Sequence, residues 1–192
     1  MKIGNFDTKF KYIPYFRNVP DVPSAWHPNE RVLTKILRTF DIPRNTAVDF
    51  GVDWGFSTAV LANHFDSVTG VDDYQEYSAT RPKGMYEKVK EKLAKWDNIT
   101  LVKSDYQTFI AKVGDTQFDL AHIDIIHDYE HTFECGLWAA NHSKITLFHD
   151  TLHYSEVFNA VVDIAAATGK TYYNFQEGFG LGILVATNRP HL

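Results

Sequence analysis

Short apolar runs alternate with helical patterns along most of this chain, and no other feature of the sequence constrains the fold as strongly. Five runs typical of strands are each followed by a segment with helical spacing of apolar residues. Two consecutive runs come last, separated by a turn around Gly178 and Gly180. Because strand–helix–strand crossovers return parallel, we expect the α/β class: a Rossmann-like seven-stranded sheet, mostly parallel, with one antiparallel strand near the C-terminus and helices on both faces.

The expected elements follow from apolar spacing and from glycine and proline breaks. Helices are expected at residues 29–40, 57–65, 81–96, 106–113, 128–142 and 153–169. Strands are expected at residues 46–50, 67–72, 98–105, 117–124, 144–150, 171–176 and 180–186. Residues 1–28 are rich in aromatic residues and prolines without a clear period, so we expect an irregular N-terminal arm there and a single domain over residues 29–192.

Composition narrows the class of partner. The chain has 24 acidic against 19 basic residues and a net charge of −5, so it lacks the positive excess that phosphate backbones attract, and no nucleic-acid partner is expected. The single cysteine, Cys135, cannot form an internal disulfide, which fits a reducing compartment. No stretch approaches the ~18 apolar residues of a membrane helix, and charges occupy the start of the chain. We therefore expect a cytoplasmic protein with no membrane partner.

The first strand ends in a glycine turn, VDFGVDWGFSTAVLA, which contains Asp49, Gly51, Gly55 and Ser57. In an open α/β sheet, ligands bind beyond the carboxyl ends of the strands, and glycines there let the backbone turn tightly and a ligand approach. The spacing is GxxxG and not the GxGxxG of dinucleotide-binding turns, so the motif does not favour a pyrophosphate.

The second strand ends in GVDDY, about twenty residues after the first glycine of that turn. A carboxylate at this position can accept hydrogen bonds from both hydroxyls of a ribose. Asp72 is the first candidate and Asp73 the second. The glycine turn and the acidic strand end together predict a nucleoside site.

With KSDY, FDLAHIDIIHDYEHTFECGLW, LFHDT and the terminal GLGIL, these motifs make residues 30–187 resemble the class I S-adenosylmethionine (SAM)-dependent methyltransferases, especially their small-molecule O-methyltransferase branch. The resemblance implies SAM as cofactor and a small molecule as the partner that accepts the methyl group. It implies that the first glycine turn lines the methionine moiety, that Asp72 holds the ribose and that Ser104 and Asp105 lie near the adenine. The cofactor-binding residues implied in this way are Asp49, Gly51, Gly55, Ser57, Asp72, Asp73, Ser104, Asp105 and Asp124.

Two further strand ends carry acids, Asp124 and Asp150, and two carboxylates at one sheet edge can hold a hard divalent cation. In the metal-dependent relatives that resemble catechol O-methyltransferase, the corresponding positions coordinate magnesium, and Thr151 stands where a third ligand would be. The alternative is that both acids cap the helices that follow them and that no metal binds.

Six of the nine histidines lie between residues 122 and 153. The resemblance makes His127, three residues after Asp124, the preferred general base for a hydroxyl acceptor, with His149 second. A rival hypothesis is a zinc hydrolase, because His127 and His131 are four residues apart at the start of an expected helix and can share one zinc ion, with Asp124, His149 or Asp150 as a third ligand.

One segment departs from the resemblance. The family usually ends the helix before the fifth strand with a glycine pair, whereas this chain has AANHSKITLF. That difference motivates another alternative, a methyltransferase-like module that binds a nucleoside without turnover. The sequence also leaves oligomerisation open, since an aromatic N-terminal arm can cover a neighbouring subunit.

Overall fold

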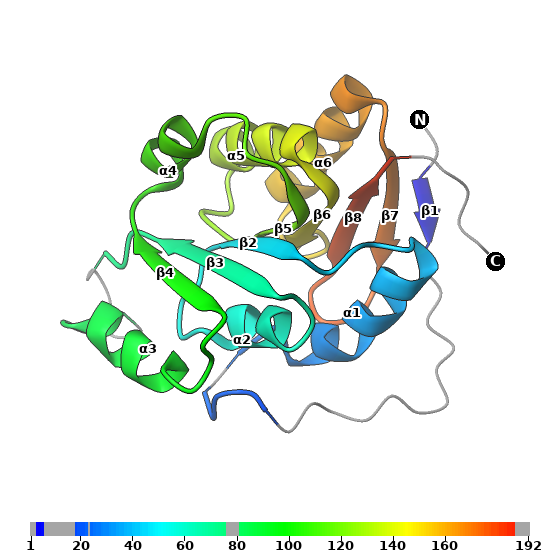
Figure 1. The fold of residues 1–192 in the computed structure, drawn as a ribbon. Helices are drawn as coiled ribbons and strands as arrows, with labels where there is room; N and C mark the ends of the chain where they lie inside the picture. Colours follow the sequence, from blue (N-terminus) through cyan, green and yellow to red (C-terminus); the bar gives the residue numbers. More distant parts are fainter. Residues whose placement is uncertain (1–2, 6–17, 23, 76–80, 187–192) are drawn as a thin grey trace.

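The computed structural model describes residues 3–5, 18–22, 24–75 and 81–186, and these form one mixed sheet with helices on both of its faces (Figure 1). The strand order is β1-β7-β8-β6-β5-β2-β3-β4. The helices are α1 (His27–Thr39), α2 (Phe56–Ala62), α3 (Met85–Leu93), α4 (Tyr106–Val113), α5 (Tyr129–His142) and α6 (Ser155–Thr168). The strands are β1 (Ile3–Asn5), β2 (Thr46–Phe50), β3 (Ser67–Asp72), β4 (Ile99–Lys103), β5 (Phe118–Ile123), β6 (Ser143–His149), β7 (Thr171–Phe175) and β8 (Leu181–Val185).

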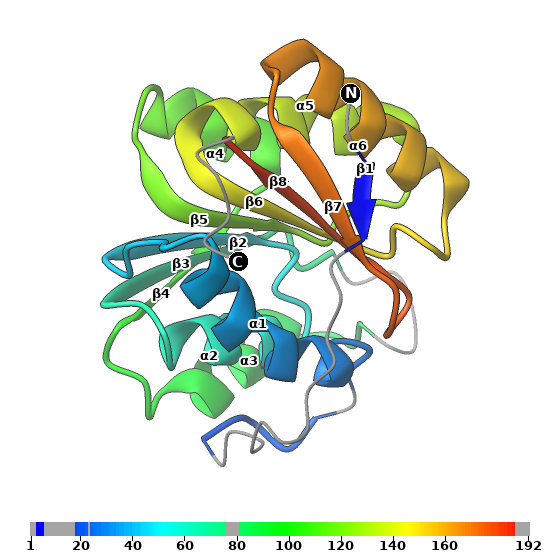
Figure 2. The same ribbon diagram turned by 90° about the vertical axis from the view of Figure 1, so that its right-hand side faces the viewer.

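The helices form two layers. Helices α1, α2 and α3 cover one face of the sheet and α4, α5 and α6 cover the other (Figures 1 and 2). Each layer has its own apolar cluster, one around Leu33 and Leu61 and the other around Phe109 and Ile164. The central strand β5 is buried along its whole length, as expected for a parallel strand covered on both faces.

The predicted fold class is confirmed. Every described strand pair is parallel except the two that involve β8, which runs antiparallel to both β6 and β7. The structure adds an eighth strand that the sequence did not predict: Ile3–Asn5 pairs in parallel with Tyr172–Asn174 of β7. This strand lies within the segment expected to be irregular, and residues 6–17 of that segment lie outside the described residues.

The connection before β6 explains the missing glycine pair. Helix α5 ends at His142 and β6 begins at Ser143, whose backbone is already extended with φ −135° and ψ 156°. The Lys170 ammonium group donates a 2.7 Å hydrogen bond to the Ser143 carbonyl oxygen. No loop residue separates the two elements, so no left-handed glycine is needed to end the helix.

The order of the strands reverses between β2 and β5, which are direct neighbours in the sheet. Loops from these two strands leave in opposite directions, which opens a crevice at their carboxyl ends. Among the described residues, no helix has the length and apolarity to cross a bilayer.

Candidate active site

A cavity of about 850 Å³ lies at the carboxyl ends of β2 to β6, within the size range of small-molecule sites. The segment Ser24–Trp26 contributes to its wall. Most of the predicted site residues line it: Gly51, Ser57, Asp72, Asp73, Ser104, Asp105, Asp124, His127, His149 and Asp150. Three predicted residues are not part of its lining: Asp49, Gly55 and Thr151.

Asp49 is fully buried and faces the protein interior. One carboxylate oxygen accepts hydrogen bonds from the hydroxyls of Ser57, at 2.9 Å, and Thr58. The other lies 2.7 Å from Nδ1 of His122, whose Nε2 lies 2.8 Å from the indole nitrogen of Trp26. Because an indole N–H only donates, Nε2 of His122 accepts and its proton is on Nδ1. Asp49 thus ties the first turn of α2 to Trp26 on the cavity wall.

The two glycines of the first turn accommodate the protein's own atoms. Gly51 has φ +92°, and a Cβ atom there would lie 1.7 Å from the carbonyl oxygen of Asp124. Gly55 has φ +88°, and a Cβ atom there would lie 2.8 Å from a methyl carbon of Leu93. We expected these glycines to let a ligand approach. In the structure, the absence of a side chain at both positions allows close packing of β2 against the end of β5 and of α2 against α3.

Asp72, at the end of β3, lies on the cavity wall and is 5% exposed. Its carboxylate accepts hydrogen bonds from the backbone N–H groups of Asp53 and Tyr74 at 3.0 and 2.7 Å. The Arg81 guanidinium group donates one hydrogen bond to each of its oxygens, both at 3.0 Å. The neighbouring Asp73 also faces Arg81, at 3.4 Å.

The residues expected near the adenine lie at the start of α4. Asp105 is the N-cap of this helix, and its side chain accepts hydrogen bonds from the backbone N–H of Thr108 at 2.7 Å and from its hydroxyl at 3.0 Å. These hydrogen bonds lower the pKa of the Asp105 carboxyl. The Ser104 hydroxyl donates to the Asp105 carbonyl oxygen. Both residues line the cavity, although Asp105 already has a structural role as a cap.

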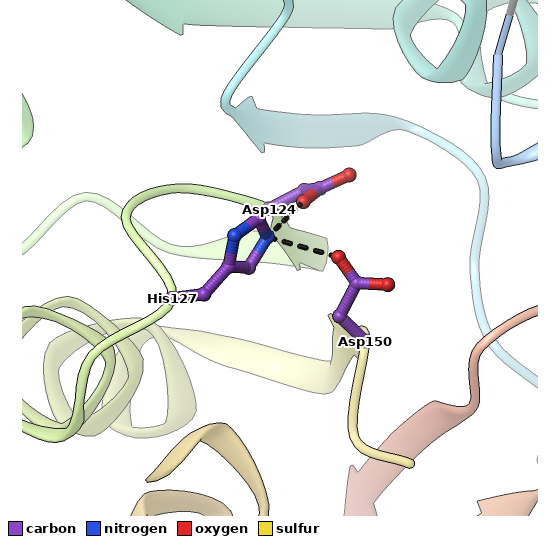
Figure 3. A group of neighbouring side chains, drawn as sticks. All are labelled: Asp124, His127 and Asp150. Carbon is purple, nitrogen blue, oxygen red and sulfur yellow. Dashed lines mark hydrogen bonds and ion pairs between the residues drawn. The ribbon is translucent and has the colours of Figure 1, made fainter. Parts of the chain in front are cut away.

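Two aspartates and two histidines meet where β5 and β6 end. Nε2 of His127 lies 3.2 Å from Asp124 and 2.9 Å from Asp150, between the two carboxylates (Figure 3). Nδ1 of His149 lies 3.3 Å from the second oxygen of each carboxylate, an ion-pair distance without hydrogen-bond geometry. The other ring nitrogen of His149, Nε2, is buried and has no hydrogen bond among the described residues.

In this cluster, the histidines and the aspartates each favour the charged form of the other. Burial disfavours a charged His127, but its contacts with Asp124 and Asp150 outweigh burial and raise its pKa to about 9. The same balance raises the pKa of His149 to about 10. Burial also opposes ionisation of the two carboxyls, yet the imidazoles hold the pKa of both Asp124 and Asp150 below the ordinary value. Without a cation, the carboxylates therefore favour the protonated form of both imidazoles, and the imidazoles favour the ionised form of both carboxyls.

These geometries decide which residues can share a cation. Ligand atoms of Asp124, His127 and Asp150 lie within 4.8 Å of one another, so the third donor beside the two acids is His127. The hydroxyl of Thr151, expected in that role, donates to the Asn174 side-chain oxygen at 2.9 Å. Two carboxylate oxygens and an imidazole nitrogen form a donor set suited to a divalent cation.

The zinc pair of the rival hypothesis is not assembled. Helix α5 begins at Tyr129, so His127 precedes the helix and the four-residue spacing does not place it beside His131. Nδ1 of His131 lies 2.7 Å from the N-cap residue Asp128. His131 lines the cavity, but among the described residues the group that can hold a metal contains His127 without it.

Sequence reasoning missed two residues that line the cavity, Trp26 and Arg81, and the buried His122, which contacts Trp26. The indole of Trp26 contacts a histidine 96 residues away in the sequence, and no local sequence pattern predicts such a contact. His122 belongs to the histidine-rich segment, but its place inside a buried strand separates it from the other histidines. For Arg81, the available signal was a basic residue that follows the acidic pair at the end of β3.

A doubly wound sheet with β8 antiparallel, a cavity at its switch point and an acid at the end of β3 define a class I methyltransferase. A family model described as a methyltransferase domain, Methyltransf_24, matches residues 48–151, more than half of the chain. The chain belongs to this family, and the resemblance to class I SAM-dependent methyltransferases is confirmed. A comparison with curated proteins gives no match.

Solved structures share the fold. The O-methyltransferase TomG from Streptomyces achromogenes, determined in complex with SAM, superposes with a TM-score of 0.64 at 14% identity, over 87% of this chain and 82% of that one. A Staphylococcus aureus protein assigned as a caffeoyl-CoA O-methyltransferase has a TM-score of 0.65 at 16% identity, over 88% and 86%. A Klebsiella pneumoniae protein assigned as an O-methyltransferase has a TM-score of 0.62 at 16% identity, over 88% and 83%.

Proposed function

We propose that this protein transfers the methyl group of SAM to a hydroxyl oxygen of a small molecule. The observation that carries the proposal is that Asp124, His127, His149 and Asp150 stand on the wall of the same cavity as Asp72. The cofactor would lie over the ends of β2, β3 and β4, and the acceptor over the ends of β5 and β6. Similarity to structures assigned as O-methyltransferases supports the choice of oxygen as the methyl acceptor.

The residues present fit SAM in size and chemistry. The cavity combines aromatic walls, Trp54 and Phe56, with Asp72, which would hold the ribose. When bound, SAM supplies a sulfonium-activated methyl group. The protein contributes by holding an acceptor oxygen in line with that methyl group, which removes much of the entropic cost of bringing two reactants together.

The acidic pair supports a divalent cation such as magnesium as a second cofactor. Asp124, His127 and Asp150 would hold it, and it would supply Lewis acidity that lowers the pKa of an acceptor hydroxyl. A cation would also compete with the proton on His127, since both need the same nitrogen lone pair. In this arrangement His127 is a ligand, although the sequence suggested it as the base.

His149 would then accept the hydroxyl proton, and because its Nε2 is buried in the cofactor-free protein, binding of the acceptor must bring the hydroxyl into contact with that nitrogen. Its Nδ1 faces the two carboxylates at 3.3 Å, which orients the ring, and its Nε2 has no hydrogen-bond partner among the described residues. This is the arrangement in which a carboxylate orients a histidine and stabilises the imidazolium that forms. Without the cation, the raised pKa of His149 keeps the ring protonated at neutral pH and unable to accept a proton.

The test combines binding and turnover. Calorimetric titration with S-adenosylhomocysteine measures the nucleoside site, and transfer of tritiated methyl from SAM to a panel of phenols, catechols and sugars measures activity. We expect micromolar binding, and turnover that needs magnesium or manganese and stops with a chelator. His149→Gln should keep S-adenosylhomocysteine binding and lose at least about a hundredfold in turnover, the lower range for a general base. Binding without transfer to any acceptor would instead favour a module without turnover.

Cation binding is tested separately by melting temperature with manganese or with a chelator. His127→Gln and Asp150→Asn should lose most of the stabilisation by manganese, because each replaces a strong ligand, the imidazole nitrogen or the charged carboxylate, with a weaker neutral amide. Thr151→Val is the matched control and should keep it, since its hydroxyl bonds to Asn174. Loss of the effect in Thr151→Val but not in His127→Gln would contradict the donor set.

A further inference from the structure

The carboxylate of Asp72 has no hydrogen-bonding capacity left. Two ionised oxygens offer about four lone-pair positions, and four donors fill them. Two are the backbone N–H groups of Asp53 and Tyr74, which are fixed by the turn after β2 and the end of β3. The other two are Nη1 and Nη2 of Arg81, each 3.0 Å from a different oxygen. A ribose therefore cannot bind to Asp72 while all four contacts persist.

Arg81 presents to Asp72 the same pattern of donors as a ribose. A guanidinium group directs two parallel N–H bonds at the two oxygens of one carboxylate. The adjacent hydroxyls of a ribose also offer two donors side by side to one carboxylate. The backbone donors cannot leave without opening the turn, whereas Arg81 is a side chain with 18% exposure. Arg81 is thus the contact that a ribose can replace.

We propose that Arg81 occupies the ribose position of the cofactor-free protein and that the nucleoside displaces it from Asp72 on binding. This inference rests on the proposed function, which places the ribose on Asp72. Arg81 therefore lowers the affinity for the cofactor, because it competes with the ribose for Asp72. It is not a residue that binds the cofactor favourably.

The surroundings give Arg81 a place to go. Asp73 lies 3.4 Å from Nη1 of Arg81, and Asp53 lies 3.8 Å from Nε. Both carboxylates are more exposed than Asp72, at 34% and 54% of the side chain against 3%. The guanidinium can release Asp72 and keep an anionic partner, so displacement does not leave an unpaired positive charge at the cavity wall. Competition therefore reduces cofactor affinity without preventing binding.

The test is calorimetric titration of S-adenosylhomocysteine into the wild type, Arg81→Met and Arg81→Lys. Methionine keeps an unbranched apolar stem and removes both competing donors, so we expect at least about tenfold tighter binding, the equivalent of one charge-assisted hydrogen bond. Lysine keeps the charge but lacks the paired donors, so Arg81→Lys should fall between the two. Lys83→Met, which removes an exposed charge from the same loop, is the matched control and should bind like the wild type.

The outcomes separate the inference from the proposed function. Weaker or unchanged binding in Arg81→Met, with wild-type binding intact and lost in Asp72→Asn, would overturn the inference and leave the proposed function standing. Absence of binding in every variant, Arg81→Met included, would contradict the proposed function itself. Thermal melting without ligand verifies that each variant is folded. If Arg81→Met does not fold, Arg81→Lys still tests the inference.

Discussion

Gly51 and Asp150 both have left-handed backbones at the edge of the cavity, with φ +92° and +62°. For glycine this conformation carries little steric cost, but for an aspartate it is strained, and such strain is typical of functional sites. In Asp150 the strained backbone directs the carboxylate toward His127 and His149. At Gly51 it brings the end of β2 against the carbonyl group of Asp124. Single-residue geometry therefore orients Asp150 and lets the backbone after β2 approach the backbone of Asp124.

Gly51→Ala should be strongly destabilising. Its Cβ would overlap a backbone oxygen at 1.7 Å, and the left-handed conformation adds its own cost. We expect a loss of roughly 3–5 kcal/mol in the free energy of unfolding. Gly169→Ala is the control, because Gly169 has a left-handed backbone (φ +68°, ψ 9°) but no atom of the described residues within 4 Å of its Cβ position, and it should cost only about 1–2 kcal/mol. Urea unfolding measures both, and equal losses would contradict the steric explanation.

Trp26→Phe tests the chain of hydrogen bonds from Trp26 through His122 to Asp49. The substitution leaves Nε2 of His122 buried without its donor, so we expect a loss of about 1–3 kcal/mol and weaker S-adenosylhomocysteine binding. Trp96→Phe is the matched control: it removes a similar buried ring whose N–H has no hydrogen bond among the described residues. The difference between the two unfolding free energies reports the hydrogen bond, and no difference would contradict the network.

At the scale of elements, the start of α5 and its end are the two places where local sequence fixes the site. Asp128 is the N-cap, and its side chain accepts a 2.9 Å hydrogen bond from the backbone N–H of His131. Because the helix begins just after it, His127 remains in the preceding loop and turns toward the acids. At the other end, Ser143 starts β6 directly and aligns that strand beside β5.

Asp128→Ala should remove the cap of α5 at a cost of about 1 kcal/mol. Asp128→Asn keeps an acceptor at the same position and should cost less, since asparagine caps nearly as well as aspartate. Chemical unfolding measures the stability, and manganese titration shows whether His127 has moved. Equal losses for alanine and asparagine would indicate that charge and not capping is what Asp128 contributes.

At the scale of the whole molecule, the sheet separates two apolar clusters, and the cavity lies at one end of the sheet between them. Stability therefore depends on groups remote from the cavity. His64, between α2 and β3, is an example: burial, assisted by Arg44, lowers its pKa from the ordinary 6.5 to about 4. The folded protein thus keeps this imidazole neutral at a pH where the unfolded chain protonates it.

This difference predicts a specific pH dependence. Between pH 6.5 and 4, His64 binds a proton in the unfolded state but not in the folded state. The free energy of unfolding therefore falls as the pH falls through this range. His64→Leu should reduce the loss between pH 7 and pH 5, measured by urea unfolding at both values. His153→Gln changes an exposed histidine and should leave that loss unchanged. A pH dependence unaffected by His64→Leu would contradict the assignment.

The sequence by itself determined the fold class, because the alternation of apolar runs and helical spacing is a local property of the chain. Each predicted strand and helix corresponds to one in the structure, within a few residues at its ends. It also identified the strand ends that carry Asp72, Asp124 and Asp150, since parallel strands bring their carboxyl ends to one edge. The three-residue strand β1 was missed because so short a segment shows no periodicity.

Only the tertiary structure decided what each site residue contacts. Asp49 faces His122 and not the cavity, His127 and not Thr151 completes the acidic pair, and Arg81 covers Asp72. These contacts join residues on different elements, and their partners depend on the direction of side chains that no local pattern encodes. Strand ends follow from periodicity along one chain, whereas side-chain partners follow from the packing of the whole sheet.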